Sequence, residues 1–128
     1  NNMESILEFE QAEVQGIRQT LKENKQVFLE NAAALFDDCF NVLMSQGAKT
    51  ESFHLMSQIK ANDDADQQEQ LSIVFNVVLN ICAQVFRVGV RSAEEFQQVI
   101  EELGLAKDAQ NMQTVFKKSY LAKIEQLQ

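Results

Sequence analysis

The densest group of potential metal ligands is the acidic segment Ala-Asn-Asp-Asp-Ala-Asp-Gln-Gln, which spans 61–68. Three ligand-type residues at alternate positions match positions 1, 3 and 5 of a calcium-binding EF-hand loop. They are Asn62, Asp64 and Asp66. The loop also requires glycine at position 6 and a bidentate glutamate at position 12, where this chain has Gln67 and Ile73. The pattern therefore predicts a solvated acidic loop whose carboxylates suit the start of the next helix.

Catalytic residues are not indicated by the remaining polar groups. The single histidine, His54, has no partner set that its spacing nominates as a triad. Adjacent carboxylates, such as Glu94 and Glu95, point apart on a helix and cannot act together as acid and base. A glycine-rich phosphate loop and an E-x-x-H motif are both absent from the sequence. We expect no catalytic, cofactor-binding or metal-binding residue and no enzyme activity.

The two cysteines, Cys39 and Cys82, lie in apolar stretches of helical periodicity. Buried reduced cysteines behave as small hydrophobic residues, and this is the interpretation we favour. A disulfide between two helices is an open alternative, but two cysteines do not form the framework of a small secreted protein. With one histidine and no C-x-x-C motif, four zinc ligands cannot be assembled.

Composition favours a helical, acidic domain. The chain has 128 residues, no proline, four glycines and a formal net charge of −8. Few turn-forming residues favour helices over sandwiches or barrels. The negative charge argues against binding of nucleic acid, which requires lysine and arginine clusters. One domain over 1–128 is the expectation for this length.

Apolar residues recur with helical spacing along nearly the whole chain. The predicted helices span 4–23, 26–46, 51–60, 67–88, 93–103 and 108–127. Gly89 and Gly104 suit the ends of two of them, and Ser92 with Glu95 forms a capping box for the fifth. The predicted fold is all-α: a compact six-helix globular domain with the apolar helix 67–88 at its centre.

The helix at 67–88 carries the longest apolar run and a set of polar residues four apart. This polar stripe consists of Ser72, Asn76, Asn80 and Gln84. The polar stripe and Arg87 argue against a membrane-spanning helix, although the run is long enough to span a bilayer. We weigh two interpretations of the polar stripe: the solvated edge of a core helix, which we favour, or a contact strip for a partner protein.

Nine phenylalanines dominate the aromatic content. Seven of them recur at helical positions: Phe28, Phe36, Phe40, Phe75, Phe86, Phe96 and Phe116. Helical spacing favours their packing in a core, and the alternative is the lining of a lipid cavity. That alternative predicts a secreted helical carrier of a small apolar ligand such as a fatty acid.

The C-terminal half carries a family resemblance. An apolar helix, Leu-Ser-Ile-Val-Phe-Asn-Val-Val-Leu-Asn-Ile-Cys-Ala-Gln (71–84), precedes a helix that closes in Glu-Glu-Leu-Gly-Leu (101–105), and a final helix follows. The part of the front half from Phe40 to the acidic segment 61–68 has helix lengths that fit the same family pattern. Residues 26–127 thus resemble the N-terminal helical domain of COMM-domain proteins, after an N-terminal helix within 1–25.

The resemblance implies a non-enzymatic scaffold module for protein–protein interaction. Members of the family assemble into a hetero-oligomeric ring and join coiled-coil subunits in an endosomal trafficking complex. The expected partners are therefore other proteins, with no nucleic acid and no membrane span, and the expected location is the cytoplasm in association with endosomes. The family's C-terminal COMM domain is not within this sequence. The carrier alternative predicts secretion instead.

Overall fold

The computed structural model describes residues 6–45, 64–105 and 110–126. These residues form α1 (Gln11–Glu23), α2 (Lys25–Ser45), α4 (Ala65–Val88), α5 (Ala93–Leu103) and α6 (Gln110–Gln126). The described ranges contain no strand, which confirms the all-α class. The described residues contain five helices, and the sixth predicted helix, over 51–60, lies outside them.

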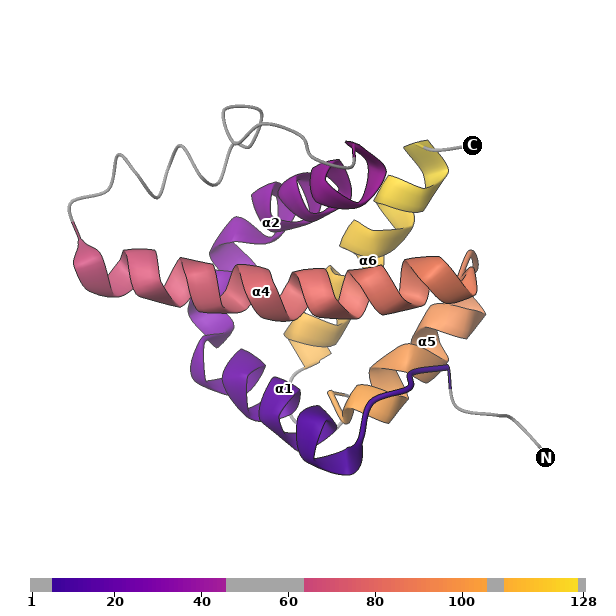
Figure 1. Cartoon of the computed structure of the whole chain (residues 1–128), viewed down its shortest axis with the longest axis horizontal. Coiled ribbons are helices and arrows are strands. Elements are labelled where there is room, and N and C mark those ends of the chain that lie inside the picture. Colours follow the sequence, from indigo (N-terminus) through magenta and orange to yellow (C-terminus); the bar gives the residue numbers. More distant parts are fainter. Residues whose placement is uncertain (1–5, 46–63, 106–109, 127–128) are drawn as a thin grey trace.

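The helices pack around one cluster of buried apolar side chains. α2 packs against α4 and α6, α5 packs against α6 and α1, and α1 also contacts α4. α4 crosses the assembly on the side shown in Figure 1, with its outer face turned away from the other helices. We predicted that α4 is the helix most nearly surrounded by the others. Instead one side of α4 forms part of the surface, because no helix of the described residues covers its polar residues and some of its apolar neighbours.

The predicted caps of α4 and α5 are confirmed. Gly89 and Gly104 end these helices with left-handed backbone, at φ values of 86° and 73°, where a residue with a Cβ is strained. At the start of α5, the Ser92 hydroxyl accepts from the Glu95 amide, and Glu95 Oε1 accepts from the Ser92 amide. These local interactions explain why both boundaries were predictable.

α4 begins earlier than predicted. Asp64 Oδ1 accepts hydrogen bonds from the amides of Asp66 and Gln67, at 3.0 and 3.2 Å. Asp64 therefore acts as the N-cap, and the part of the predicted acidic loop from Ala65 onward is helical. Polar composition alone suggested a loop, but polar residues are tolerated in the exposed first turn of a helix.

The first helix begins later than predicted. We expected a helix over 4–23, but α1 begins at Gln11 and residues 6–10 are not helical. The Glu10 amide donates to Glu13 Oε1, which marks the helix start. The apolar residues before Glu10 match helical spacing, but the amides of Ile6, Leu7 and Glu8 donate to side chains of α5 and α4, as described below. Tertiary contacts thus override the local pattern.

α1 and α2 are separated at Asn24, within the break predicted between residues 23 and 26. The amide and the side-chain Nδ2 of Asn24 both donate to Thr20 O. α2 is kinked at Asn31, whose φ and ψ are −123° and 15°. Asn31 Nδ2 donates to Val27 O at 2.9 Å, so a side chain takes the place of a regular helical bond.

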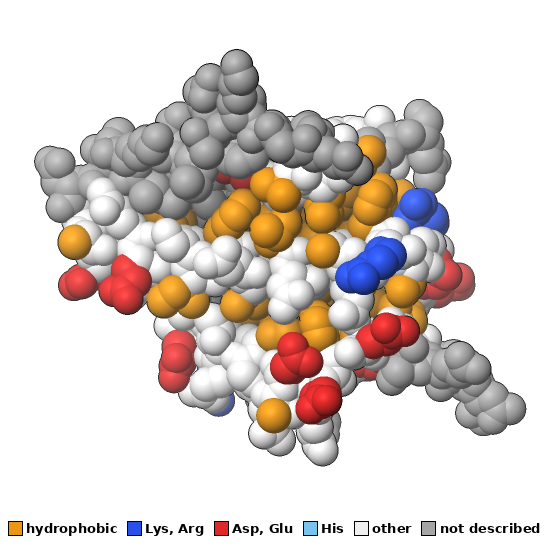
Figure 2. Space-filling model, viewed as in Figure 1, with side chains coloured by type: hydrophobic (Ala, Val, Ile, Leu, Met, Phe, Trp, Pro, Cys, Tyr) orange, Lys and Arg blue, Asp and Glu red, His pale blue; other side chains and the backbone are white. Residues whose placement is uncertain are grey.

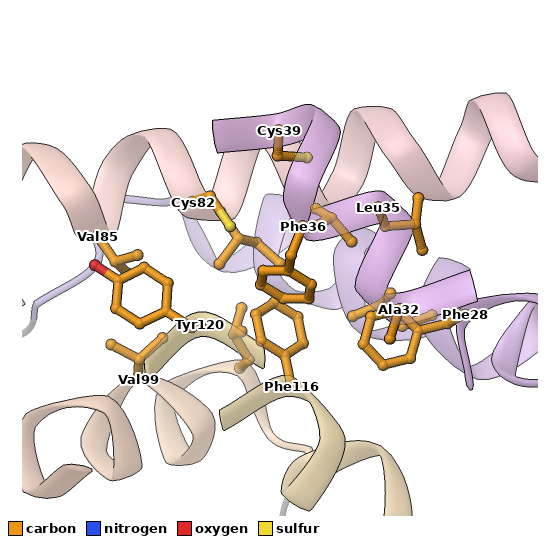
Figure 3. Close-up of a cluster of buried hydrophobic side chains, with 14 of the residues drawn as sticks. Phe28, Ala32, Leu35, Phe36, Cys39, Cys82, Val85, Val99, Phe116 and Tyr120 are labelled. Carbon is orange, nitrogen blue, oxygen red and sulfur yellow. The ribbon is translucent and has the colours of Figure 1, made fainter. Parts of the chain in front are cut away.

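An aromatic cluster joins α2, α5 and α6. The ring of Phe116 lies 5.6 Å from Phe28, 5.2 Å from Phe36 and 5.6 Å from Phe96. Tyr120 stacks on Phe96 at 4.6 Å, and Figure 3 shows its ring near side chains of α4 and α5. Such aromatic contacts stabilise a core beyond the area they bury. The periodicity of these residues therefore reports a packed core.

Val78 tests the assignment of the buried face of α4. It is fully buried, so Val78→Asp places an unpaired charge in the core. We expect the free energy of unfolding to fall by several kcal/mol, which is a large part of the about 5–15 kcal/mol that stabilises a typical domain. Circular dichroism should show an unfolded chain. Asn76→Asp, at an exposed site of the same helix, is the control and should leave the melting temperature within a few degrees of wild type. A cooperatively folded V78D monomer would contradict the assignment.

Glu95 makes the cap of α5 dependent on pH. The Arg91 amide donates to its carboxylate, and with the hydroxyl and amide of Ser92 it holds the pKa of Glu95 below its usual value. The folded pKa is thus below the unfolded one, so the stabilisation is present above the unfolded pKa and is lost as pH falls through the folded pKa. Urea denaturation should find Glu95→Gln less stable than wild type at pH 7, with the difference vanishing in acid. A difference that does not change with pH would refute this origin.

Candidate functional site

Three acidic residues within the described ranges stabilise the fold. Asp64 caps α4, Glu95 caps α5 and Asp37 forms an ion pair with Lys123. No group of three metal-binding side chains occurs among the described residues. His54 and Asn62, which the sequence analysis considered, lie outside these residues.

The two cysteines are free and buried, as predicted. Burial raises the pKa of both thiols far above the ordinary value, and Cys39 is further affected by Cys82 and Asp38. Thiols held in the protonated form are poor nucleophiles. Figure 3 shows Cys39 on α2 and Cys82 on α4 within the apolar cluster. Their surroundings are those of core residues.

The phenolic hydroxyl of Tyr120 is also engaged within the core. It donates to Val90 O at 3.0 Å, which ties α6 to the turn between α4 and α5. Burial raises the pKa of Tyr120, so the phenol stays protonated as a hydrogen-bond donor. The hydroxyl therefore has a positioning role in the fold.

The outer face of α4 combines apolar and polar side chains on one element. Ser72, Asn76 and Asn80 are exposed along it. Apolar residues flank these polar groups, and Ile73 and Val88 retain 39% and 49% of their accessible surface. Figure 2 shows apolar side chains along both edges of α4 on this side of the molecule. Contiguous apolar area on a protein surface is typical of an interaction site. Partly buried residues of α4 extend the exposed apolar area here: Phe75, Val77, Leu79 and Phe86.

The polar stripe is slanted rather than straight. Four residues advance a helix by one turn plus about 40°, so each member lies further around α4 than the one before. Gln84 has thereby rotated toward the side where the N-terminal segment runs. It is half-buried, and its Oε1 accepts a hydrogen bond from the Glu8 amide. Ser72, Asn76 and Asn80 thus face outward, whereas Gln84 binds another part of the chain.

The N-terminal strap, residues 6–10, is a feature that the sequence analysis missed. The two carboxylate oxygens of Glu102 accept from the Ile6 and Leu7 amides, each at 2.9 Å. The Leu7 side chain is buried, with 5% of its surface accessible. Figure 1 shows the strap crossing α5. No local sequence pattern distinguishes Glu102 from its neighbour Glu101. The two differ because the fold places the amides of Ile6 and Leu7 against Glu102.

Two hollows flank α6. One, of about 440 Å³, lies between α2 and α6 and has an apolar floor that includes Ala32, Phe36 and Val115. The other, of about 480 Å³, includes Arg91 and Leu121. Lys118 and Ala122 line both hollows. Both are open to the surface, and the first is the better suited to an apolar ligand.

α4 is also the one helix among the described residues that is long and apolar enough to cross a membrane. Length and composition alone are weak grounds, since core helices of water-soluble proteins pass the same test. Only 33% of its most apolar 18-residue segment is buried. The absence of a membrane span stays a prediction.

Searches with this chain found no matching family model, no matching curated protein and no matching solved structure. The resemblance to COMM-domain proteins therefore rests on the residue pattern alone. The candidate site consists of the exposed face of α4 and the strap beside it.

Asn80 tests whether the outward part of the polar stripe is solvated. Asn80→Leu places a better helix former at an exposed site, so the melting temperature should be unchanged or raised by a few degrees. Gln84→Leu is the contrasting variant, because it removes the acceptor of the Glu8 amide. It should lower the free energy of unfolding by about 1 kcal/mol. Thermal unfolding by circular dichroism measures both. A loss of several degrees in N80L would show that Asn80 makes a buried hydrogen bond.

Proposed function

We propose that the chain is a non-enzymatic protein–protein interaction module of a scaffold. The observation that carries the proposal is the outer face of α4. Ile73 and Val88 are exposed there beside Ser72, Asn76 and Asn80, and further apolar side chains of this helix are only partly buried: Phe75, Val77, Leu79 and Phe86. Apolar area beside neutral polar groups suits a protein partner. Such a partner can bury the apolar area and form hydrogen bonds with the polar groups. Glu95 caps α5, and Cys39 and Cys82 are buried thiols with raised pKa values, which further supports a non-catalytic role.

The finer proposal follows the residue pattern of 26–127. It assigns the chain to the COMM-domain type, acting in the cytoplasm within an endosomal trafficking complex. Its partners would be hetero-oligomeric members of that family and their coiled-coil subunits. The confirmed helical class and the exposed helix face are consistent with such a role and give it a defined surface.

The test is binding to purified coiled-coil subunits and COMM-domain proteins, measured by surface plasmon resonance. The double variant Asn76→Arg/Asn80→Arg should weaken binding at least tenfold, because two bulky charges interrupt the face. Gln15→Arg/Gln19→Arg is the matched control: it has the same spacing, the same amide-to-arginine change and exposed sites on α1. Both variants should keep the wild-type melting temperature. Equal binding by the two variants would refute the α4 surface, and no binding by wild type would refute this set of partners.

The alternative is a helical carrier of a small apolar ligand. The hollow between α2 and α6 favours it, since its floor includes Phe36 and Val115 and its volume is about 440 Å³. The ring contacts of Phe28, Phe36 and Phe116 instead favour a filled interior. Native mass spectrometry of the purified chain separates the two functions. A retained apolar adduct supports the carrier, and a bare mass after incubation with fatty acid contradicts it.

A further inference from the structure

The N-terminal strap is bound like a peptide ligand. Three consecutive amides, those of Ile6, Leu7 and Glu8, donate to side chains of α5 and α4 rather than to neighbouring backbone. The acceptors are the carboxylate of Glu102 and the side-chain carbonyl of Gln84. Main-chain amides recognised by side chains, together with one inserted apolar residue, are features of receptors for extended peptides.

The receptor side of this contact is held in place by its own helices. Gln98 Nε2 donates to Glu102 Oε2 at 2.8 Å, one helical turn away on α5. This bond orients the carboxylate so that each oxygen faces one strap amide. Gln84 is fixed by its place on α4. The acceptors therefore belong to packed helices, and their arrangement does not require the strap.

The strap itself contributes little that is specific to its sequence. Its deepest side chain is Leu7, while Ile6 and Phe9 are only partly buried against the core and Glu8 is exposed. Amide hydrogen bonds are available to any residue except proline. Another extended segment with leucine in the central position would make the same contacts.

We propose that the place held by the strap, called the groove below and defined by Glu102 of α5, Gln84 of α4 and the buried position of Leu7, binds an extended segment of a partner protein, which enters by displacing residues 6–10. The partner segment presents three consecutive amides and a leucine flanked by apolar or acidic residues, as the strap does. The inference rests on the proposed function of the chain as an interaction module and names a second surface for it. The strap then acts as an intramolecular competitor that lowers the affinity for partner segments.

The test uses the full chain and a peptide of the strap sequence. Leu7→Asp should release the strap, because a carboxylate cannot occupy the buried leucine site. A fluorescein-labelled peptide, Met-Glu-Ser-Ile-Leu-Glu-Phe-Glu, serves as the probe in fluorescence polarisation. We expect it to bind L7D at least tenfold more tightly than wild type, whose strap competes. The same peptide with aspartate in place of leucine should not bind.

Matched variants locate the binding site. Adding Glu102→Ala to L7D should weaken peptide binding at least tenfold, since both amide contacts are lost. Adding Glu101→Ala instead should leave it unchanged, because Glu101 is the exposed neighbour on the same helix. Equal effects of the two substitutions, or no peptide binding by a folded L7D chain, would overturn the proposal. The α4 variants N76R/N80R leave this groove intact, so failure here is distinguishable from failure of the proposed function.

Hydrogen exchange of the wild-type chain provides a second test that needs no variant. If the strap is displaceable, the amides of Ile6, Leu7 and Glu8 should exchange much faster than those in the middle of α4. If these amides exchange only with global unfolding, or if L7D does not unfold cooperatively, the strap is an integral part of the core and the proposal fails.

Discussion

The packing around Phe116 is the contact on which the rest of the structure depends. Its ring lies within 5.6 Å of the rings of Phe28, Phe36 and Phe96, so one side chain of α6 joins α2 and α5. Tyr120, one turn later, stacks on Phe96 and donates to Val90 O. Because α6 holds these elements together, α4 can contribute one face to the core and leave the other exposed. The candidate interaction surface is thus a consequence of where the aromatic residues lie.

Sequence reasoning was most successful where the determining interaction is local. The capping box of Ser92 and Glu95 and the left-handed glycines Gly89 and Gly104 depend on residues within one turn, and their boundaries were predicted correctly. The buried, free state of Cys39 and Cys82 also followed from apolar periodicity. Helical class and most of the core were therefore predictable, because burial repeats with the helical period.

The early start of α4 was missed although its Asp64 cap is local. The other misses share one cause, which is that the deciding contact is distant in sequence. Ile6 fits a helical pattern, but its amide binds Glu102, 96 residues away, and the chain there is not helical. Gln84 was grouped with three outward residues by spacing, yet the slant of the helix brings it to the strap. Which side of α4 stays open likewise depends on the packing of other helices. The period of apolar residues indicates which face of a helix is buried and how wide that face is. It does not identify the element that packs against the face.

Two features of this chain limit unwanted association of its apolar surface: its net charge and the intramolecular strap. Apolar surface in water favours association, and a formal net charge of −8 opposes association between copies of this chain. Repulsion acts over the whole molecule, whereas the strap covers one local groove and satisfies Glu102 and Gln84 there. The outer face of α4 has no such intramolecular ligand among the described residues, and its polar groups need only solvent. A partner could therefore dock on α4 without displacing any part of the chain described here, but it must compete with the strap to enter the groove beside α5.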